Sequence, residues 1–377
     1  MKWARRVVDK TWFPEDLHYN RWVRLPSTDA GKPDLEFLTL RRRALYDSVW
    51  SRGTCVWEAI RRGDESGKRY ILKETWRQVE DIDEKIFYER IMQYDTNLRN
   101  PLFGVAGFVR SVDYGALEGQ GVPTLHRTSS ASLRPIMQAK RGERTLVRLV
   151  VDTIGEELED FECSKDFIAG IRDAVQGHHL AYKAGVLHSD ISDGNVLLTH
   201  GSPFKGFIHD FDMAAFIDSS ADGGTELPTA LRALSDQQLR MCKGTPRFVA
   251  IELVETRNHP IVREATHDLQ SFYWIILMYG VGFMPNKFVE PETIYSRLFL
   301  ASSWDEMAAA RRTWLKEDIP ERFWGSKPIQ FLMGSLKEQV RRSVPGDDNP
   351  QPMKLKHESF LAVLDEALAM EGWPEKD

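Results

Sequence analysis

The chain of 377 residues has a formal net charge of −6 at pH 7, and 42% of its residues are hydrophobic and 28% are charged. This composition is typical of a globular protein with large cores, and the length suits two or three units or one bilobal enzyme. The negative charge, without a dense block of Lys and Arg, argues against nucleic acid as a partner. Three widely separated cysteines argue against a disulfide framework and a cysteine-based zinc site, and they favour a reducing compartment.

No targeting or membrane-spanning segment is visible. The N-terminus is followed by charged residues and has no apolar core of a signal peptide. The strongest apolar run, residues 272–284, is too short to span a bilayer and predicts a buried helix. We therefore expect an intracellular protein, cytoplasmic or nuclear, with no membrane partner.

The first 155 residues predict strands, because short β-like runs at 70–72, 105–109 and 146–151 are broken by Gly and Pro. A hairpin signal lies at residues 51–56, where Ser51, Gly53 and Thr54 are candidate contacts to a nucleotide, since their backbone N–H groups can approach phosphates. The signal is a poor match to G-x-G-x-x-G, because Gly53 is its only glycine.

Lys73 follows the run at 70–72, where a strand would direct its ammonium towards the α- and β-phosphates of a nucleotide. A carboxylate from the next helix should pair with it. Glu84 is the preferred partner, because two aromatic residues one turn further on can pack on the same face. Glu89 is the alternative, and for either residue a solvated charge on a helix surface is an equally open interpretation.

Beyond residue 155 the pattern becomes helical. Ser164 can cap an amphipathic helix that Gly185 ends, and apolar residues at 360, 364 and 368 predict another helix near the C-terminus. The segment 218–239 begins with Ser, Asp and Gly, and we expect it to be mobile. The whole pattern predicts an α+β, bilobal fold: a strand-rich N-lobe with an N-terminal extension over residues 1–155, and a helical C-lobe over residues 156–377.

The most informative stretch, residues 188–198, reads HSDISDGNVLL and sets Asp190 and Asn195 five residues apart on one loop; Asp210 follows fifteen residues later. Phosphoryl transfer from ATP requires an acceptor for the substrate hydroxyl proton and two oxygen ligands for Mg²⁺. We assign the first role to Asp190 and the metal to Asn195 and Asp210. A non-catalytic Asp-rich turn is the alternative, and two such motifs at this separation disfavour it.

Three further features accompany this constellation. Residues 243–252, KGTPRFVAIE, are typical of the end of a kinase activation segment. Asp268 opens the buried helix, where its carboxylate can brace the catalytic loop through backbone N–H groups or cap the helix. His178 is interpreted as a hydrogen-bonded core residue and His188 as a residue that holds the loop backbone, because no zinc-ligand spacing is present.

With these motifs, the chain resembles the fungal-specific protein-kinase-like family, a divergent branch of the eukaryotic protein kinases. The resemblance covers about residues 53–279 and is carried by LHSDIS-x-GN, by DFD at 210–212, by GT through AIEL at 244–253 and by HDL-x-SF at 267–272. It implies a protein-kinase-like fold, binding of ATP and Mg²⁺, and phosphorylation of Ser or Thr on a protein substrate.

Three departures from the kinase pattern bear on activity. Ser189 stands where most protein kinases have Arg, so the usual docking charge for a phosphorylated activation segment is missing. Ser192 replaces the Lys that contacts the γ-phosphate, and losing a charged stabiliser of the transition state slows catalysis. Asp212 replaces the Gly of Asp-Phe-Gly, where it adds a metal ligand or adopts a left-handed conformation.

In the mechanism we expect, Lys73 grips the phosphates and adenine lies between Ile71 and Leu197, near the backbone of residues 150–153. Two alternatives remain. A small-molecule phosphotransferase of the aminoglycoside or choline kinase type also favours a small residue after the loop His, although it lacks a segment like 244–252. A pseudokinase that binds nucleotide without turnover agrees with the weak glycine loop and with Ser192.

Overall fold

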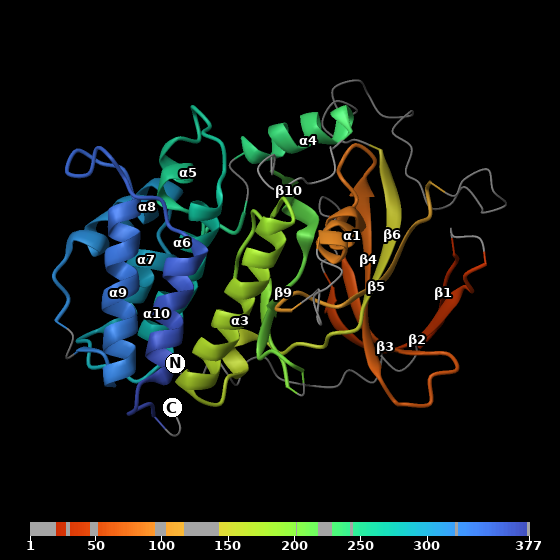
Figure 1. The fold of residues 1–377 in the computed structure, drawn as a ribbon, viewed down its shortest axis with the longest axis horizontal. Coiled ribbons are helices and arrows are strands. Elements are labelled where there is room, and N and C mark those ends of the chain that lie inside the picture. The colour runs from red at the N-terminus through yellow and green to blue at the C-terminus, as the bar shows by residue number, and fades with distance from the viewer. Residues whose placement is uncertain are drawn as a thin grey trace. The chain divides into compact units, whose positions relative to one another are not determined.

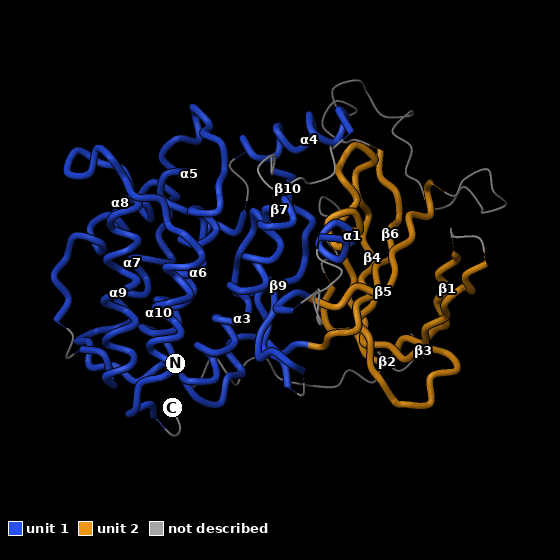
Figure 2. The backbone as a smooth tube through the Cα atoms, in the orientation of Figure 1, with its two compact units in different colours: residues 1, 89–105, 155–377 blue, residues 2–88, 106–154 orange. Residues whose placement is uncertain are grey.

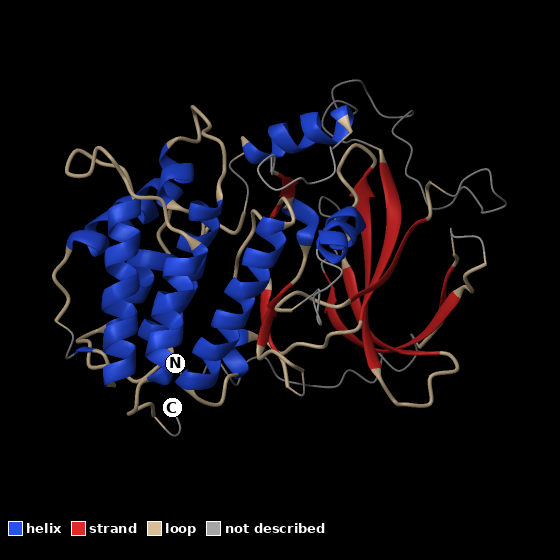
Figure 3. Cartoon of the chain, viewed as in Figure 1, coloured by secondary structure: helices blue, strands red, loops and turns tan. Residues whose placement is uncertain are grey.

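The computed structural model describes residues 20–27, 31–45, 52–94, 103–116, 143–200, 202–217, 228–241, 244–320 and 323–374. The chain forms two compact units (Figure 2): residues 2–88 with 106–154, and residue 1 with 89–105 and 155–377. The first unit is rich in strands and the second is mainly helical (Figure 3), so the predicted α+β class is confirmed. The compact units do not correspond to a single cut in the chain, and the lobes 1–155 and 156–377 stay a prediction.

The first unit is built on one antiparallel sheet of six strands in the order β1-β2-β3-β4-β6-β5. Successive side chains of a strand point to opposite faces. On β4, Tyr70 and Leu72 therefore join an apolar core with Trp57, whereas Lys73 points to the other face. The strands are β1 (Trp22–Leu25), β2 (Leu35–Leu45), β3 (Cys55–Arg61), β4 (Arg69–Gln78), β5 (Phe108–Asp113) and β6 (Arg144–Val151).

Helix α1 (Glu84–Tyr94) begins in the first unit and ends in the second. Asp83, just before it, accepts a hydrogen bond from the backbone N–H of Lys85 at 3.1 Å, which satisfies one of the orphan donors of the first turn. Phe87 and Tyr88 are buried, as expected for the apolar face that follows Glu84. Lys73 lies on β4 and Glu84 opens α1, so strand and helix bring opposite charges into the same unit.

The second unit centres on α6, of which every residue from Ala265 to Val281 is buried. A helix that is buried on every side lies in the interior of its unit, and α6 packs against α3, α7 and α9 (Figure 1). The helices of this unit are α3 (Ser164–Lys183), α4 (Thr229–Leu239), α5 (Ile251–Glu255), α6 (Ala265–Gly282), α7 (Pro291–Phe299), α8 (Trp304–Lys316), α9 (Lys327–Ser343) and α10 (His357–Ala369).

Two short antiparallel ladders fix the loops of the second unit. In one, β8 (Val196–Leu198) pairs with β9 (Gly206–Ile208). In the other, β7 (Val186–Leu187) pairs with β10 (Ala215–Phe216). The loop that carries Asp190 connects β7 to β8, and Asp210 lies between β9 and β10. Each of the two loops is therefore held at both of its ends by backbone pairing.

Several local predictions need correction. Cys163, not Ser164, occupies the N-cap of α3, and no side chain caps it. Asp268 is not a cap either, because α6 begins at Ala265 and Glu264 is its N-cap. Residues 229–239 form α4, whose Leu239 packs with apolar residues of β7, β10 and α6, and this burial favours the helix; the mobility expected for this segment stays a prediction. Residues 218–227 lie outside the described part.

Other local predictions are confirmed. Gly185 follows the end of α3 in the left-handed conformation (φ 81°) that a helix C-terminus often requires. The apolar series near the C-terminus forms α10, in which Phe360 and Leu364 are fully buried. Among the helices that the structure describes, none is long and apolar enough to cross a membrane.

Candidate active site

The imidazole ring of His188 holds the backbone of the catalytic loop. Its Nε2 lies 2.9 Å from the carbonyl oxygen of His209, and its Nδ1 accepts a bond from the backbone N–H of Asp190 at 3.3 Å. Because a carbonyl only accepts, Nε2 carries the proton and the ring is the neutral tautomer. Burial lowers the pKa of His188, which agrees with a neutral ring. The side chain thus ties the loop to the chain just before Asp210.

Ser189 adopts a left-handed backbone conformation, with φ at 67°. Its backbone N–H donates to Oδ2 of Asp268 at 2.8 Å, and His178 Nε2 lies 3.1 Å from the same oxygen. Arg263 Nε lies 3.3 Å from the other oxygen, Oδ1. Burial by itself would raise the pKa of Asp268, but the bond from His178 and the charge of Arg263 keep it lowered. Asp268 is therefore a buried carboxylate that braces the catalytic loop, as the sequence predicts.

The Asp190 carboxylate is fixed from two sides. Its Oδ1 accepts bonds from the backbone N–H and the hydroxyl of Thr245, at 2.8 and 3.0 Å. Nδ2 of Asn195 donates to Oδ2 at 3.2 Å and to the Asp190 carbonyl at 2.8 Å. The amide nitrogen of Asn195 is thereby committed to Asp190, so Oδ1 is the atom that Asn195 can offer to a cation. The sequence analysis included Thr245 only as part of a motif and did not predict its bond to Asp190.

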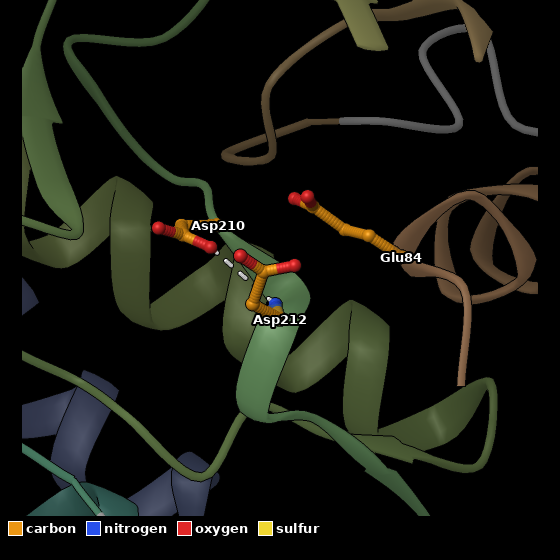
Figure 4. Close-up of side chains that lie close together, drawn as sticks. All are labelled: Glu84, Asp210 and Asp212. Carbon is orange, nitrogen blue, oxygen red and sulfur yellow. Dashed lines mark hydrogen bonds between the residues drawn. The ribbon is translucent and has the colours of Figure 1, made fainter. Parts of the chain in front are cut away.

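Asp210 and Asp212 flank the start of the 3₁₀ turn η5 (Phe211–Met213). Asp210 is left-handed (φ 64°), and its carboxylate accepts a bond from the backbone N–H of Asp212 at 3.4 Å (Figure 4). The left-handed conformation expected for Asp212 is wrong, because Asp210 and not Asp212 has a positive φ. The metal-ligand role of Asp212 stays a prediction.

The donor set of this unit suits a hard divalent cation. Asn195 contributes an amide oxygen, and Asp210 and Asp212 contribute carboxylates, which are the oxygen ligands that Mg²⁺ prefers. Both carboxylates are partly exposed rather than buried. These residues therefore fit the Mg²⁺ that the sequence predicts.

The segment after residue 243 is anchored to α6 by one side chain, Gln270. Its Oε1 lies 3.3 Å from the backbone N–H of Ile251, and its Nε2 donates to both carboxylate oxygens of Glu252, at 2.9 and 2.7 Å. The Pro that the kinase pattern places at position 251 has no backbone N–H to donate. Because Ile251 stands there instead, its N–H can donate to Gln270. Burial raises the pKa of Glu252 to about 6.

Arg311 of α8 also holds this segment, and the sequence analysis missed it. Its guanidinium donates to the carbonyls of Arg247, Val249 (3.0 Å) and Leu298 (3.2 Å). It lies 4.7 Å from the Trp274 ring centroid, and burial lowers its pKa to about 9. No sequence pattern signals these contacts, because backbone carbonyls occur at every residue.

The first unit contains the other predicted residues. Lys73 Nζ donates to Glu84 Oε2 at 2.8 Å, and both side chains are buried, so the structure pairs Lys73 with Glu84, the preferred partner. Figure 4 shows Glu84 on α1. Gly53 has φ at 55°, and the hydroxyl of Thr54 lies 3.1 Å from that of Thr75.

The remaining candidates are less informative. Ser51 lies outside the described residues. Ile71, on β4 of the first unit, and Leu197, on β8 of the second, are both half-buried. Leu197 lies opposite Phe207 in its ladder, and a Cβ added at Gly155 would meet its side chain at 2.5 Å. These positions leave part of each side chain open to a ligand.

The fold is that of a protein kinase. The chain is similar to the solved structure of vaccinia related kinase 3, with a TM-score of 0.54 at 11% identity over 89% of this chain and 87% of that one. The structure of the Cydia pomonella Granulovirus kinase PK-1 matches at 11% identity over 86% and 92%, with a TM-score of 0.48, too low to support an argument. At such identities the likeness establishes the fold alone.

The family resemblance follows from the sequence. Residues 106–279 match the family model described as fungal protein kinase, so this part of the chain is similar to that family. The match includes the catalytic loop, Asp210 and the segment 244–252, and it begins after Lys73 and Glu84. None of the curated proteins compared with the chain matches its sequence.

Proposed function

We propose that the chain is an ATP-dependent phosphotransferase that acts as a Ser/Thr protein kinase. One observation carries the proposal: Thr245 donates twice to the carboxylate of Asp190. In protein kinases the Asp of this loop orients the acceptor hydroxyl and receives its proton. The bond from Thr245 ties this group to the segment that would receive a peptide. A small-molecule phosphotransferase has no use for that link, so a protein acceptor is favoured.

The proposed roles follow the chemistry of each group. Asp190 orients the acceptor and takes its proton, while Asn195 and Asp210 hold Mg²⁺. The metal neutralises charge on the phosphate oxygens of ATP. Lys73, oriented by Glu84, binds the α- and β-phosphates as a point charge.

The rest of the nucleotide would be bound with less charge. Backbone N–H groups near Ser51, Gly53 and Thr54 would approach the phosphates. Ile71 and Leu197 would provide apolar contact to the adenine. These assignments carry less of the proposal than Asp190 does, because apolar and backbone contacts serve many ligands.

A nucleotide-binding pseudokinase is the second candidate, and Ser192 favours it. Ser192 is only 4% exposed and uncharged, so it does not supply the cation that Ser/Thr kinases place two residues after the catalytic Asp. Such a protein would bind Mg·ATP, and binding would stabilise it by RT ln(1 + [L]/Kd), without turnover.

The test incubates the purified chain with Mg²⁺ and γ-labelled ATP. Acceptors are a basic protein, an acidic protein and a panel of amino alcohols and aminoglycosides. The inactive variant is Asp190→Ala, and the matched control is Asp160→Ala, whose side chain is exposed on η4 (Leu158–Asp160).

Label on protein that disappears only in Asp190→Ala supports the kinase. Label on a small molecule supports the aminoglycoside or choline kinase type. No label with ATP-dependent thermal stabilisation supports the pseudokinase, and no label without stabilisation rejects nucleotide binding altogether.

A further inference from the structure

A chain of buried hydrogen bonds connects the catalytic loop to the C-terminal helix α10. It begins at the backbone N–H of Ser189, which donates to Oδ2 of Asp268 at 2.8 Å. His178 Nε2 lies 3.1 Å from the same oxygen, and His178 Nδ1 lies 2.8 Å from Nε2 of His357. Asp268 and His178 are fully buried, and His357 is 4% exposed. Four residues from distant parts of the sequence thus form one polar path.

The ring of His357 is held by aromatic packing as well as by its hydrogen bond. It stacks on His179 with centroids 4.5 Å apart and planes 7° apart, and it lies 5.0 Å from the ring of His178. The ring of Tyr182 is 5.3 Å away. These three residues belong to α3, and α10 packs along α3 (Figure 1). His357 is the first residue of α10, so the helix presents this ring to α3 in one orientation.

The chemistry of the carboxylate and the rings defines the hydrogen bonds along the path. A carboxylate only accepts, so His178 Nε2 carries the proton between His178 and Asp268. His357 Nε2 is the hydrogen-bond partner of His178 Nδ1. Burial lowers the pKa of His357 to about 2, so its ring is neutral at ordinary pH. Arg263, 3.3 Å from Asp268, is the other charged group that faces this carboxylate. A buried carboxylate in such a network is costly when one of its partners is lost.

The end of the path on the catalytic loop is a strained residue. Ser189 has φ at 67°, a conformation that non-glycine residues rarely adopt and that persists only when its surroundings hold it. The bond from its N–H to Asp268 is the contact that holds it. Asp190, the next residue, depends on the same backbone. Asp268 therefore helps to position the backbone of Asp190, while Thr245 and Asn195 hold its carboxylate directly.

We infer that His357 is a positioning residue for the catalytic loop, acting through His178 and Asp268 on Ser189 and so on Asp190. Helix α10 lies beyond residues 106–279, so the inference adds to the catalytic apparatus a helix outside the part matched by the family. Its kinetic consequence rests on the proposed function, whereas its structural consequence does not.

The experiment compares two substitutions at one position. His357→Phe keeps the stacked ring but removes both nitrogens, whereas His357→Gln replaces Nε2 with an amide that can still reach His178. Leu364→Ala is the matched control: Leu364 is fully buried on α10, so its truncation weakens the helix without touching the polar path. His357→Asn, whose amide is shorter, replaces His357→Phe if that variant does not fold.

Two readouts are measured at pH 7: hydrogen exchange at the Ser189 amide, and kcat with the KM for ATP. In His357→Phe we expect exchange at Ser189 to be about tenfold faster and kcat about tenfold lower with KM little changed, because small misplacements of a catalytic group are costly. His357→Gln should stay within about twofold of the parent in both. Leu364→Ala should lower the melting temperature without these effects.

Equal behaviour of His357→Phe and Leu364→Ala would overturn the inference, since the effect would then be one of stability. Failure of His357→Gln to recover either readout would overturn it too. If the parent chain shows no turnover, the proposed kinase function fails, and the exchange rate at Ser189 alone decides the inference.

Discussion

The two units keep charges in their interiors in different ways. In the first unit the partners are neighbours in the sheet: Glu74 lies opposite Arg148 in the β4–β6 ladder, and the two side chains are bonded at 2.8 Å. Lys73, the preceding residue on β4, donates to Glu84 of α1 at 2.8 Å. In the second unit Asp268 is contacted by Ser189 and His178, which are 79 and 90 residues away in the sequence, and by the nearby Arg263. Sheet register decides the partner of Glu74 and the start of α1 decides that of Lys73, whereas helix packing decides the partners of Asp268.

The difference predicts different responses to mutation. A pair of two side chains such as Lys73 and Glu84 is local, so a substitution there should be felt mainly through the partner that remains. A buried network is shared by several elements, so a change at one end should appear at the other. The four predictions that follow test this contrast.

The largest effect on kcat is expected at Asp210, which belongs neither to the buried ion pair nor to the buried network. Asp210→Asn keeps the size of the side chain and tolerates the left-handed backbone. Because the substitution removes a charged metal ligand, kcat should fall on the order of 10²- to 10³-fold. Unfolding in urea should be nearly unchanged. Asp212→Asn run in parallel reports whether Asp212 is a second ligand, and an unchanged kcat for Asp210→Asn would reject the assigned role.

Next in size is the loss of one partner from the buried pair of the first unit. Lys73→Met leaves the Glu84 carboxylate buried without its Lys73 partner, and stability should fall by about 3–5 kcal/mol. The double variant Lys73→Met/Glu84→Leu should recover most of that loss, since replacing both charges with apolar groups is often neutral. Urea unfolding of the parent, both single variants and the double variant gives the coupling energy. A coupling energy near zero would contradict a local pair.

The histidines give a pH dependence that belongs to the second unit, because every histidine in the described part of the chain lies there. Burial lowers the pKa of His267 to about 4 and that of His357 to about 2. The unfolded chain binds protons at these rings below about pH 6.5 and the folded chain does not, so stability falls as the pH falls.

The loss begins near pH 6.5 and continues to about pH 4 for His267 and towards pH 2 for His357. In His357→Gln the slope of unfolding free energy between pH 6 and 5 should be smaller by about 1 kcal/mol per pH unit. Urea unfolding across this range measures it, and an unchanged slope would show that His357 is protonated in the folded state.

An effect smaller than the loss of Lys73 is expected at Glu252, whose pKa burial raises to about 6. A raised pKa means that the folded chain favours the neutral acid, so the stability present below about pH 4.5 is lost as the pH rises through 6. Glu252→Gln should therefore be more stable than the parent by about 2 kcal/mol at pH 8. At about pH 4 the two should differ little, and the same difference at both pH values would exclude titration of Glu252 as the cause.

The residues that could be predicted from the sequence are those whose spacing along one loop carries the chemistry. Asp190 and Asn195 belong to the same turn, so their five-residue separation is visible without any fold. The pairing of Lys73 with Glu84 was predictable only as one of two options, because the choice depends on how α1 turns relative to β4. The contacts of Gln270 and Arg311 had no signal, because their partners are backbone groups or a carboxylate far away in the sequence.

By itself, the sequence determined the kinase-like class, the strand-rich and helical parts, and the loops that carry Asp190 and Asp210, because these depend on periodicity and short spacing. Only the tertiary structure decided that α4 is a helix, that Asp210 rather than Asp212 is left-handed, and that His178 joins Asp268 to His357. The physical reason is common to all three. Burial and backbone geometry depend on residues that become neighbours only when the chain folds.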